Sequence, residues 1–211
     1  MRWSDDGVVI PQVHTKLHKV VILDGSGSMR GAKYNNAELG VKQDYEACKK
    51  EFAESLLVEF SNYNTSVLYN FTTPLKFKPS YGGTALYDTI VQVFTTLLNT
   101  PGDEKILVQI FTDGEDLHSM LQSKGQAKKL IEQFNSKGWT VTFVGTKEDV
   151  EDIQMNLSVD ATNTLVHDNT AKGVKMSFET YTEATRSYTK DVARGIDVTN
   201  NFFKDINKTN G

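Results

Sequence analysis

Residues 20–31, VVILDGSGSMRG, decide how the rest of the chain is interpreted. Four consecutive apolar residues run directly into Asp24, and glycine and serine then alternate through Ser28. An unbroken apolar run that ends at a charged residue is typical of a strand buried on both faces of a parallel sheet. Asp24, Ser26 and Ser28 would then occupy alternate positions of the loop that follows this strand.

The remainder of the chain predicts further strands that alternate with helices. Apolar runs at 104–116, 139–146 and 163–168 predict strands, and 65–73 and 75–80 predict two more at a sheet edge. Helical periodicity predicts helices over 37–60, 81–100 and 173–192, with Cys48 as a small buried residue of the first. Ser123 and Gln126 match a capping box that opens another helix.

This order of elements predicts an α/β fold. We expect a doubly wound, Rossmann-like and mostly parallel sheet with one antiparallel edge strand and helices on both faces. Residues 1–18 would form a leader, with 8–13 as a candidate extra edge strand. Residues 19–195 would form one domain, and 196–211, which lose periodicity, a partly ordered tail.

Composition and charge exclude several classes of protein. The formal net charge of −4 and the pI of about 5.6 argue against a protein that binds the nucleic-acid backbone. The N-terminus has no apolar stretch of signal-peptide length, and no segment approaches the ~20 apolar residues that span a membrane. The single cysteine, Cys48, favours a reducing compartment. We therefore expect a cytoplasmic protein with no nucleic-acid or membrane partner.

Oxygen-bearing side chains follow the buried strands. Asp24 and Asp113 each come directly after one, and ligands of open parallel sheets bind at the carboxyl ends of the strands. Thr84 enters a helix after two glycines, at a position where it could also be the N-cap. Two adjacent carboxylates repel unless a cation compensates them, and no protein cation is evident near them in the sequence. Carboxylate and hydroxyl oxygens suit Mg²⁺, or Mn²⁺ or Ca²⁺, better than Zn²⁺.

Three motifs together resemble a known family. DGSGS at 24–28, GGT at 82–84 and TDG at 112–114 are similar, in order and spacing, to the metal-ion-dependent adhesion site of von Willebrand factor type A (vWA) domains. The resemblance extends over residues 19–188 and is similar to small stand-alone versions from bacteria and phages. This chain departs from animal adhesion relatives because it lacks a secretion signal and flanking cysteines.

The resemblance implies a role for each residue of these motifs. Ser26 and Ser28 would bind the cation directly, Asp24 and Asp113 directly or through water, and Thr84 directly when a ligand is bound. An aspartate or glutamate of a partner protein would fill the open coordination position. We expect the partner-binding loops to include Gly83, Asp88, Glu115 and Asp116. Asp88 could instead support the first loop from behind or be a plain surface carboxylate, and Glu115 and Asp116 could be first-turn helix acids.

Other sites fit the residues less well. The spacing of Gly25, Gly27 and Gly31 departs from a dinucleotide-binding GxGxxG loop. A serine nucleophile would need a histidine base that a third group orients. His118 is the histidine nearest the expected site, and nothing in the sequence marks it as oriented. An aspartyl phosphatase typically has a second aspartate two residues after the first, where this chain has Ser26.

The sequence thus predicts a non-enzymatic, metal-dependent protein-binding module in a bacterial cell or a phage-infected host. The alternative is a magnesium-dependent phosphatase or phosphodiesterase. A third prospect, implied by the resemblance, is a subunit that works with an ATPase. The partner is not identified by the sequence.

Overall fold

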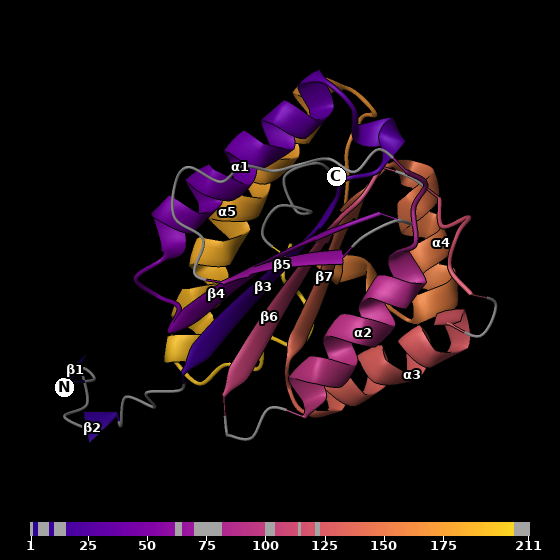
Figure 1. Cartoon of the computed structure of the whole chain (residues 1–211). Coiled ribbons are helices and arrows are strands. Elements are labelled where there is room, and N and C mark those ends of the chain that lie inside the picture. Colours follow the sequence, from indigo (N-terminus) through magenta and orange to yellow (C-terminus); the bar gives the residue numbers. More distant parts are fainter. Residues whose placement is uncertain are drawn as a thin grey trace.

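The computed structural model describes residues 2–3, 9–10, 16–61, 65–69, 82–99, 104–113, 115–120 and 123–204. Strands and helices alternate over most of this range (Figure 1). The strands are β1 Arg2–Trp3, β2 Val9–Ile10, β3 Leu17–Asp24, β4 Glu54–Phe60, β5 Thr65–Tyr69, β6 Lys105–Phe111, β7 Thr140–Gly145 and β8 Thr164–Val166. The helices are α1 Ala32–Cys48, α2 Leu86–Leu98, α3 Ser123–Ser136, α4 Lys147–Leu157 and α5 Ala171–Ala193, with short 3-10 turns at Gly27–Met29 and Ala161–Asn163.

Six strands form the central sheet in the order β5-β4-β3-β6-β7-β8. Strands β4, β3, β6, β7 and β8 pair in parallel, and β5 pairs antiparallel with β4. The predicted α/β architecture, with parallel strands flanked by helices, is confirmed. Strand order reverses beside β3, because β4 lies on one side of it and β6 on the other.

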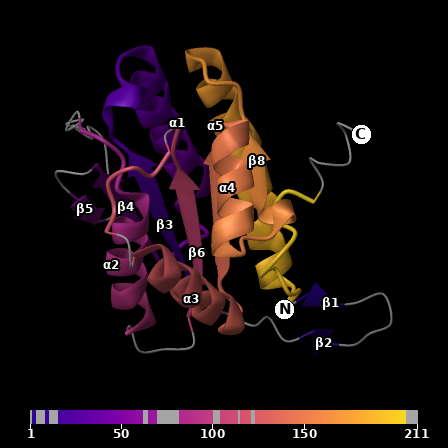
Figure 2. The ribbon, with the colours of Figure 1, turned by 90° about the vertical axis from the view of Figure 1, so that its right-hand side faces the viewer.

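Helices cover both faces of the sheet (Figure 2), and each face has its own apolar core. Side chains alternate along β3, so that Val21 and Leu23 pack with α1 and α5, whereas Val20 and Ile22 pack with α2, α3 and α4. Because both faces are covered, every residue from 19 to 24 is buried. This two-sided burial explains the unbroken apolar run in the sequence.

The predicted helix over 37–60 was wrong in its second half. Helix α1 ends at Cys48, and Glu54–Phe60 is strand β4, which pairs with β3 along its whole length. The sequence ESLLVEF is a short apolar run, and periodicity alone does not distinguish such a run from one turn of a buried helix. The neighbouring strand β3, which offers a free edge to pair with, decides for the strand.

The ends of the chain also differ from the sequence-based expectation. Strand β2, within the candidate edge strand at 8–13, pairs antiparallel with β1 in a separate two-stranded sheet. The segment expected to be a partly ordered tail contributes Val198, Phe202 and Phe203 to the core around α5. The packed domain therefore continues beyond residue 195, at least to Phe203. The strand expected at 75–80 lies outside the described residues.

Two helix starts differ from their predicted caps. Ala85, not Thr84, is the N-cap of α2, and no side chain caps that helix end from this position. Ser123 begins α3, but its hydroxyl donates to Asp88 instead of accepting in a capping box.

Helix α5, with 23 residues, is the longest described. In the part of the chain that the structure covers, no helix combines the length and apolar character needed to cross a bilayer.

Candidate metal centre

The candidate centre lies where β3 and β6 end side by side. Asp24 is the last residue of β3, and Asp113 follows β6 by two residues. These strands are neighbours in register, with Leu23 paired to Phe111. Strand order reverses beside β3, and the loops after β3 and β6 lead to helices on opposite faces of the sheet. Open parallel sheets generally bind ligands at such a reversal. Both predicted carboxylates are therefore placed at the position where such folds bind ligands.

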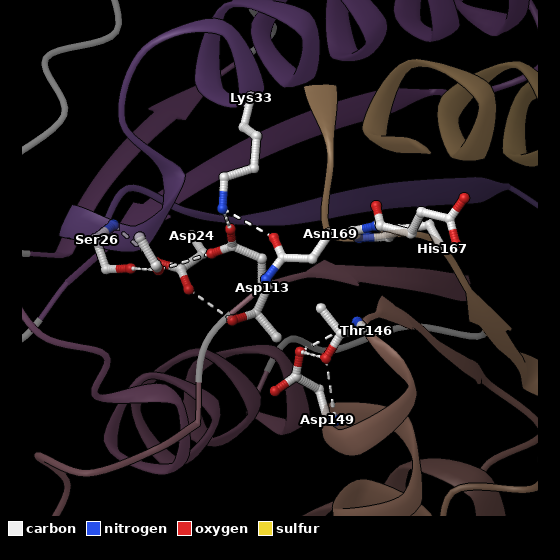
Figure 3. A network of polar contacts seen from close by, with 11 residues as sticks. Asp24, Ser26, Lys33, Asp113, Thr146, Asp149, His167 and Asn169 are labelled. Atoms are coloured by element: carbon white, nitrogen blue, oxygen red, sulfur yellow. Dashed lines mark hydrogen bonds and ion pairs between the residues drawn. The ribbon is translucent and has the colours of Figure 1, made fainter. Parts of the chain in front are cut away.

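A chain of hydrogen bonds joins four of the five predicted ligands (Figure 3). The backbone N–H of Ser26 donates to Asp24 Oδ1 at 2.7 Å. The hydroxyls of Ser26 and Ser28 lie 2.9 Å apart, and Ser28 donates to Asp113 Oδ1 at 2.7 Å. Residues from two loops, 85 positions apart in the sequence, thus meet in one oxygen-rich cluster.

Asp24 is buried, and in the described part of the chain its hydrogen-bond donors are neutral groups. It is fully inaccessible to solvent, and the Thr112 hydroxyl donates to its second oxygen at 2.5 Å. Burial raises the pKa of Asp24 to about 6 from its ordinary 3.8, and the charge of nearby Asp113 adds to the rise. Hydrogen bonds from Thr112 and Ser26 oppose it. Neutral donors hold this carboxylate, and they do not cancel the cost of burying its charge.

Asp113 has a cationic partner that the sequence did not reveal. The ammonium of Lys33, in the first turn of α1, pairs with Asp113 Oδ2 and also donates to Asn169 Oδ1 at 2.9 Å. The Asp113 side chain is fully inaccessible, and that of Lys33 is one-fifth exposed. The expectation that no protein cation lies near the two carboxylates was therefore wrong. Lys33 and Asn169 are 136 positions apart, so no local pattern predicts their meeting.

The loop that contains Thr84 reaches the same edge of the sheet through a backbone hydrogen bond of Gly82. The N–H of Gly27 donates to the carbonyl of Gly82 at 2.8 Å, which ties the loop before α2 to the loop after β3. Thr84 is buried, but its side chain makes no hydrogen bond to the other four predicted ligands in the described part of the chain. The exposed ring of His118 lies against Gly83, and the His118 N–H donates to the Thr84 carbonyl at 3.2 Å. This loop borders the cluster without joining it.

Two of the three acidic residues expected in the partner-binding loops, Asp88 and Asp116, make local hydrogen bonds. Asp88 accepts hydrogen bonds from the Met120 N–H and the Ser123 hydroxyl, so it supports these two residues and not the loop after β3. Asp116 is not in a helix of its own but accepts from the Tyr87 N–H at the start of α2, at 2.7 Å. Exposed Glu115 borders a cavity of about 250 Å³ between α2 and α4. The cavity adjoins Thr112, whose hydroxyl holds Asp24.

The donor set fits a hard divalent cation. Two inaccessible carboxylates and two serine hydroxyls converge, and Mg²⁺, Mn²⁺ and Ca²⁺ prefer such oxygen ligands. Among the described residues, no three carboxylate, histidine or cysteine side chains gather where they could hold a metal ion. A site made of those side chains alone is therefore not found there. The cluster therefore matches a mixed carboxylate and hydroxyl site.

Comparison with solved structures identifies the fold. No family model matches the sequence, and no curated protein matches it. Two crystal structures of the pilus adhesin SpaC from Lactobacillus rhamnosus GG match 86% of this chain, with TM-scores of 0.63 and 0.61 and identities of 11% and 13%. The ArnB paralog VWA2 from Sulfolobus acidocaldarius matches 79% of it, with a TM-score of 0.57 and 15% identity. The fold is vWA-like.

This vWA-like chain corresponds to a part of each of these structures. It spans 31% and 30% of the SpaC chains and 45% of VWA2. At such low identity, the likeness concerns the path of the backbone. Any role for the oxygen cluster has to be argued from the cluster itself.

Proposed function

We propose that this chain is a protein-binding module whose interaction depends on a divalent cation. Asp24, Ser26, Ser28 and Asp113 would hold Mg²⁺, or Mn²⁺ or Ca²⁺, at the edge of the sheet, and Thr84 would join them when a partner is bound. When present, the cation supplies an electrophilic centre for an aspartate or glutamate of the partner protein. The cytoplasmic location expected from the sequence belongs to this proposal.

One observation carries the proposal more than any other. Asp24 is an inaccessible carboxylate whose partners are neutral donors, beside a second inaccessible carboxylate. A buried charge without a counter-charge is costly, and a natural sequence keeps such a group mainly for function. The sheet topology supports the same interpretation, because Asp24 and Asp113 follow the carboxyl ends of the neighbouring strands β3 and β6, where open parallel sheets commonly bind ligands.

We propose no catalytic role for these residues. A phosphatase of the aspartyl type would need a second acid near the nucleophile, and the position two residues after Asp24 is Ser26. A serine hydrolase would need a histidine held by a third group. His118 instead lies exposed against Gly83.

Thermal unfolding with and without Mn²⁺ or Mg²⁺ tests the metal site. The ion should raise the melting temperature of the wild type, because it binds the folded state alone. Asp24→Asn keeps the size of the side chain but removes its charge, and it should abolish that rise. Glu183→Gln, an equal change of charge on the exposed face of α5, should respond as the wild type does. Equal metal-induced stabilisation of the wild type and Asp24→Asn would contradict the proposed metal site.

A pull-down with and without chelator then tests the partner. Wild-type protein should retain a specific protein in Mg²⁺ and lose it in chelator, and Asp24→Asn should fail to retain it in either. If the protein is retained equally with and without chelator, and equally by Asp24→Asn, the interaction lies elsewhere on the surface. Metal-dependent hydrolysis of phosphomonoesters or phosphodiesters that vanishes in Asp24→Asn would favour the alternative function, a magnesium-dependent phosphatase or phosphodiesterase.

A further inference from the structure

Lys33 connects the candidate metal centre to a distant segment. Its ammonium lies between the Asp113 carboxylate and the side-chain carbonyl of Asn169, as Figure 3 shows. Asn169 is two residues before α5, and the Asn36 side chain, one turn further along α1, donates to the Ala171 carbonyl at 2.6 Å. The start of α1 is thereby fastened to the start of α5 beside the centre.

In the described part of this cluster, the buried carboxylates outnumber the ammonium group paired with them. Two inaccessible carboxylates, Asp24 and Asp113, face one ammonium. Lys33 pairs with Asp113, whereas the donors to Asp24 are neutral. A divalent cation that binds both carboxylates would lie near the ammonium, and the two positive charges would repel each other.

We propose that Lys33 is an intramolecular competitor of the divalent cation. This inference rests on the proposed function. In the metal-free protein the ammonium neutralises Asp113, and it has to leave that carboxylate when the ion binds. The carbonyl of Asn169 gives the displaced ammonium a hydrogen-bond partner beside the centre. Lys33 can therefore leave Asp113 while the first turn of α1 stays folded.

The competition has two consequences. The metal-free fold escapes most of the penalty of an unpaired buried carboxylate at Asp113, so the protein folds before it meets the ion. Affinity for the ion falls by the strength of the ion pair that it displaces. A monovalent cation brings no more charge than the ammonium already present, so the lysine also favours divalent over monovalent ions.

Calorimetric titration with Mn²⁺, without any partner, tests this role directly. Lys33→Gln should bind Mn²⁺ at least about tenfold more tightly than the wild type. The same variant should melt at a lower temperature in chelator and gain more from Mn²⁺. Lys33→Arg keeps the charge and should stay nearer to the wild type. Lys42→Gln removes a charge from the same helix, where Lys42 pairs with Glu38, and should leave Mn²⁺ affinity unchanged.

Each outcome decides the matter. Equal or weaker Mn²⁺ binding by Lys33→Gln would overturn the competitor role while leaving the metal site in place. Absence of Mn²⁺ binding in both proteins would overturn the proposed function as well. If Lys33→Gln does not fold without metal, Asn169→Ala serves in its place, because it removes the second anchor and keeps the charge. That variant should bind Mn²⁺ about threefold more weakly than the wild type, because the displaced ammonium loses its partner. An unchanged or tighter affinity would contradict the proposal.

Discussion

Gly40 of α1 and Phe178 of α5 are in direct contact across the interface of the two helices. A methyl group added at Gly40 would lie 2.3 Å from Phe178 Cγ. The Phe178 ring in turn stacks on Phe111, with ring centroids 4.2 Å apart, and Phe111 ends the strand that leads to Asp113. The absence of a side chain at Gly40 therefore allows the aromatic packing beneath the candidate metal centre.

Gly40→Ala should lower the free energy of unfolding by at least about 2 kcal/mol, because the inserted methyl group forces Phe178 or a helix to move. Urea denaturation measures this change. Gly125→Ala in α3 is the matched control, since a methyl group there meets nothing within 4 Å. It should stabilise the protein by roughly 0.5–1 kcal/mol through helix propensity. Equal effects of the two substitutions on the free energy of unfolding would contradict a close contact between Gly40 and Phe178.

Thr84→Ala should weaken binding of the acidic partner at least about tenfold, roughly 1.4 kcal/mol, with little change in metal-free stability. The Thr84 hydroxyl makes no hydrogen bond to the other four ligands in the described structure, so its contribution is expected only in the complex. Calorimetry in Mg²⁺ measures the loss, with Thr95→Ala on the exposed side of α2 as control. The effect should be non-additive with replacement of the partner's acidic residue, because both changes break one set of bonds. Undiminished binding by Thr84→Ala would place the recognised surface elsewhere.

Affinity for Mn²⁺ should fall as the pH is lowered through about 6. The pKa of Asp24 is raised to about 6, so a proton competes with the ion below that pH, whereas the carboxylate is free above it. We expect binding about tenfold weaker at pH 5 than at pH 7.5. Titrations at four pH values between 5 and 8 measure this change. A flat profile would mean that Asp24 does not bind the ion in its ionised form.

Glu59 should make the metal-free protein less stable as the pH rises. Its carboxylate lies against Gly25, beneath the loop after β3, and burial raises its pKa to about 7 from its ordinary 4.5. Between these two values the folded state binds more protons than the unfolded state, so stability is lost as the pH rises from about 4.5 to 7 and stays constant above. Glu59→Gln removes this titration.

The variant should therefore be more stable than the wild type at pH 8, by roughly 1–3 kcal/mol. The difference should shrink at pH 5, where the wild-type carboxyl is already protonated in the folded state. Urea denaturation in chelator at both pH values measures it. A stability difference that is the same at pH 5 and pH 8 would contradict the raised pKa.

Lys19 and Asp44 form a buried ion pair between β3 and α1, and both side chains are almost inaccessible. Lys19→Met should cost roughly 3–5 kcal/mol of stability, because it leaves the Asp44 charge buried without a partner. The double variant Lys19→Met with Asp44→Leu should recover much of that loss, since no charge then remains buried. Denaturation of both single variants and the double variant completes the cycle. Simple additivity of the two single losses would show that the pair does not interact.

The sequence by itself determined the alternation of elements and the edge where the candidate ligands gather. Apolar runs that end in Asp24 and shortly before Asp113 are a local signal, because a strand buried on both faces needs apolar residues throughout and charge only after it ends. Parallel strands bring their carboxyl ends to one edge, so local positions sufficed to place these two carboxylates together. The family resemblance of the three motifs added Ser26, Ser28 and Thr84.

The tertiary structure decided what local patterns do not encode. Strand β4 was taken for helix because ESLLVEF is compatible with both, and pairing with β3 settles its form. Phe202 and Phe203 lack a periodic neighbourhood, yet they fill the core beside Tyr181 of α5. Lys33 meets Asp113 and Asn169 only because α1, the end of β6 and the start of α5 converge in space. Long-range packing and charge pairing depend on the whole fold, so no local sequence pattern shows that Asp113 is paired with Lys33.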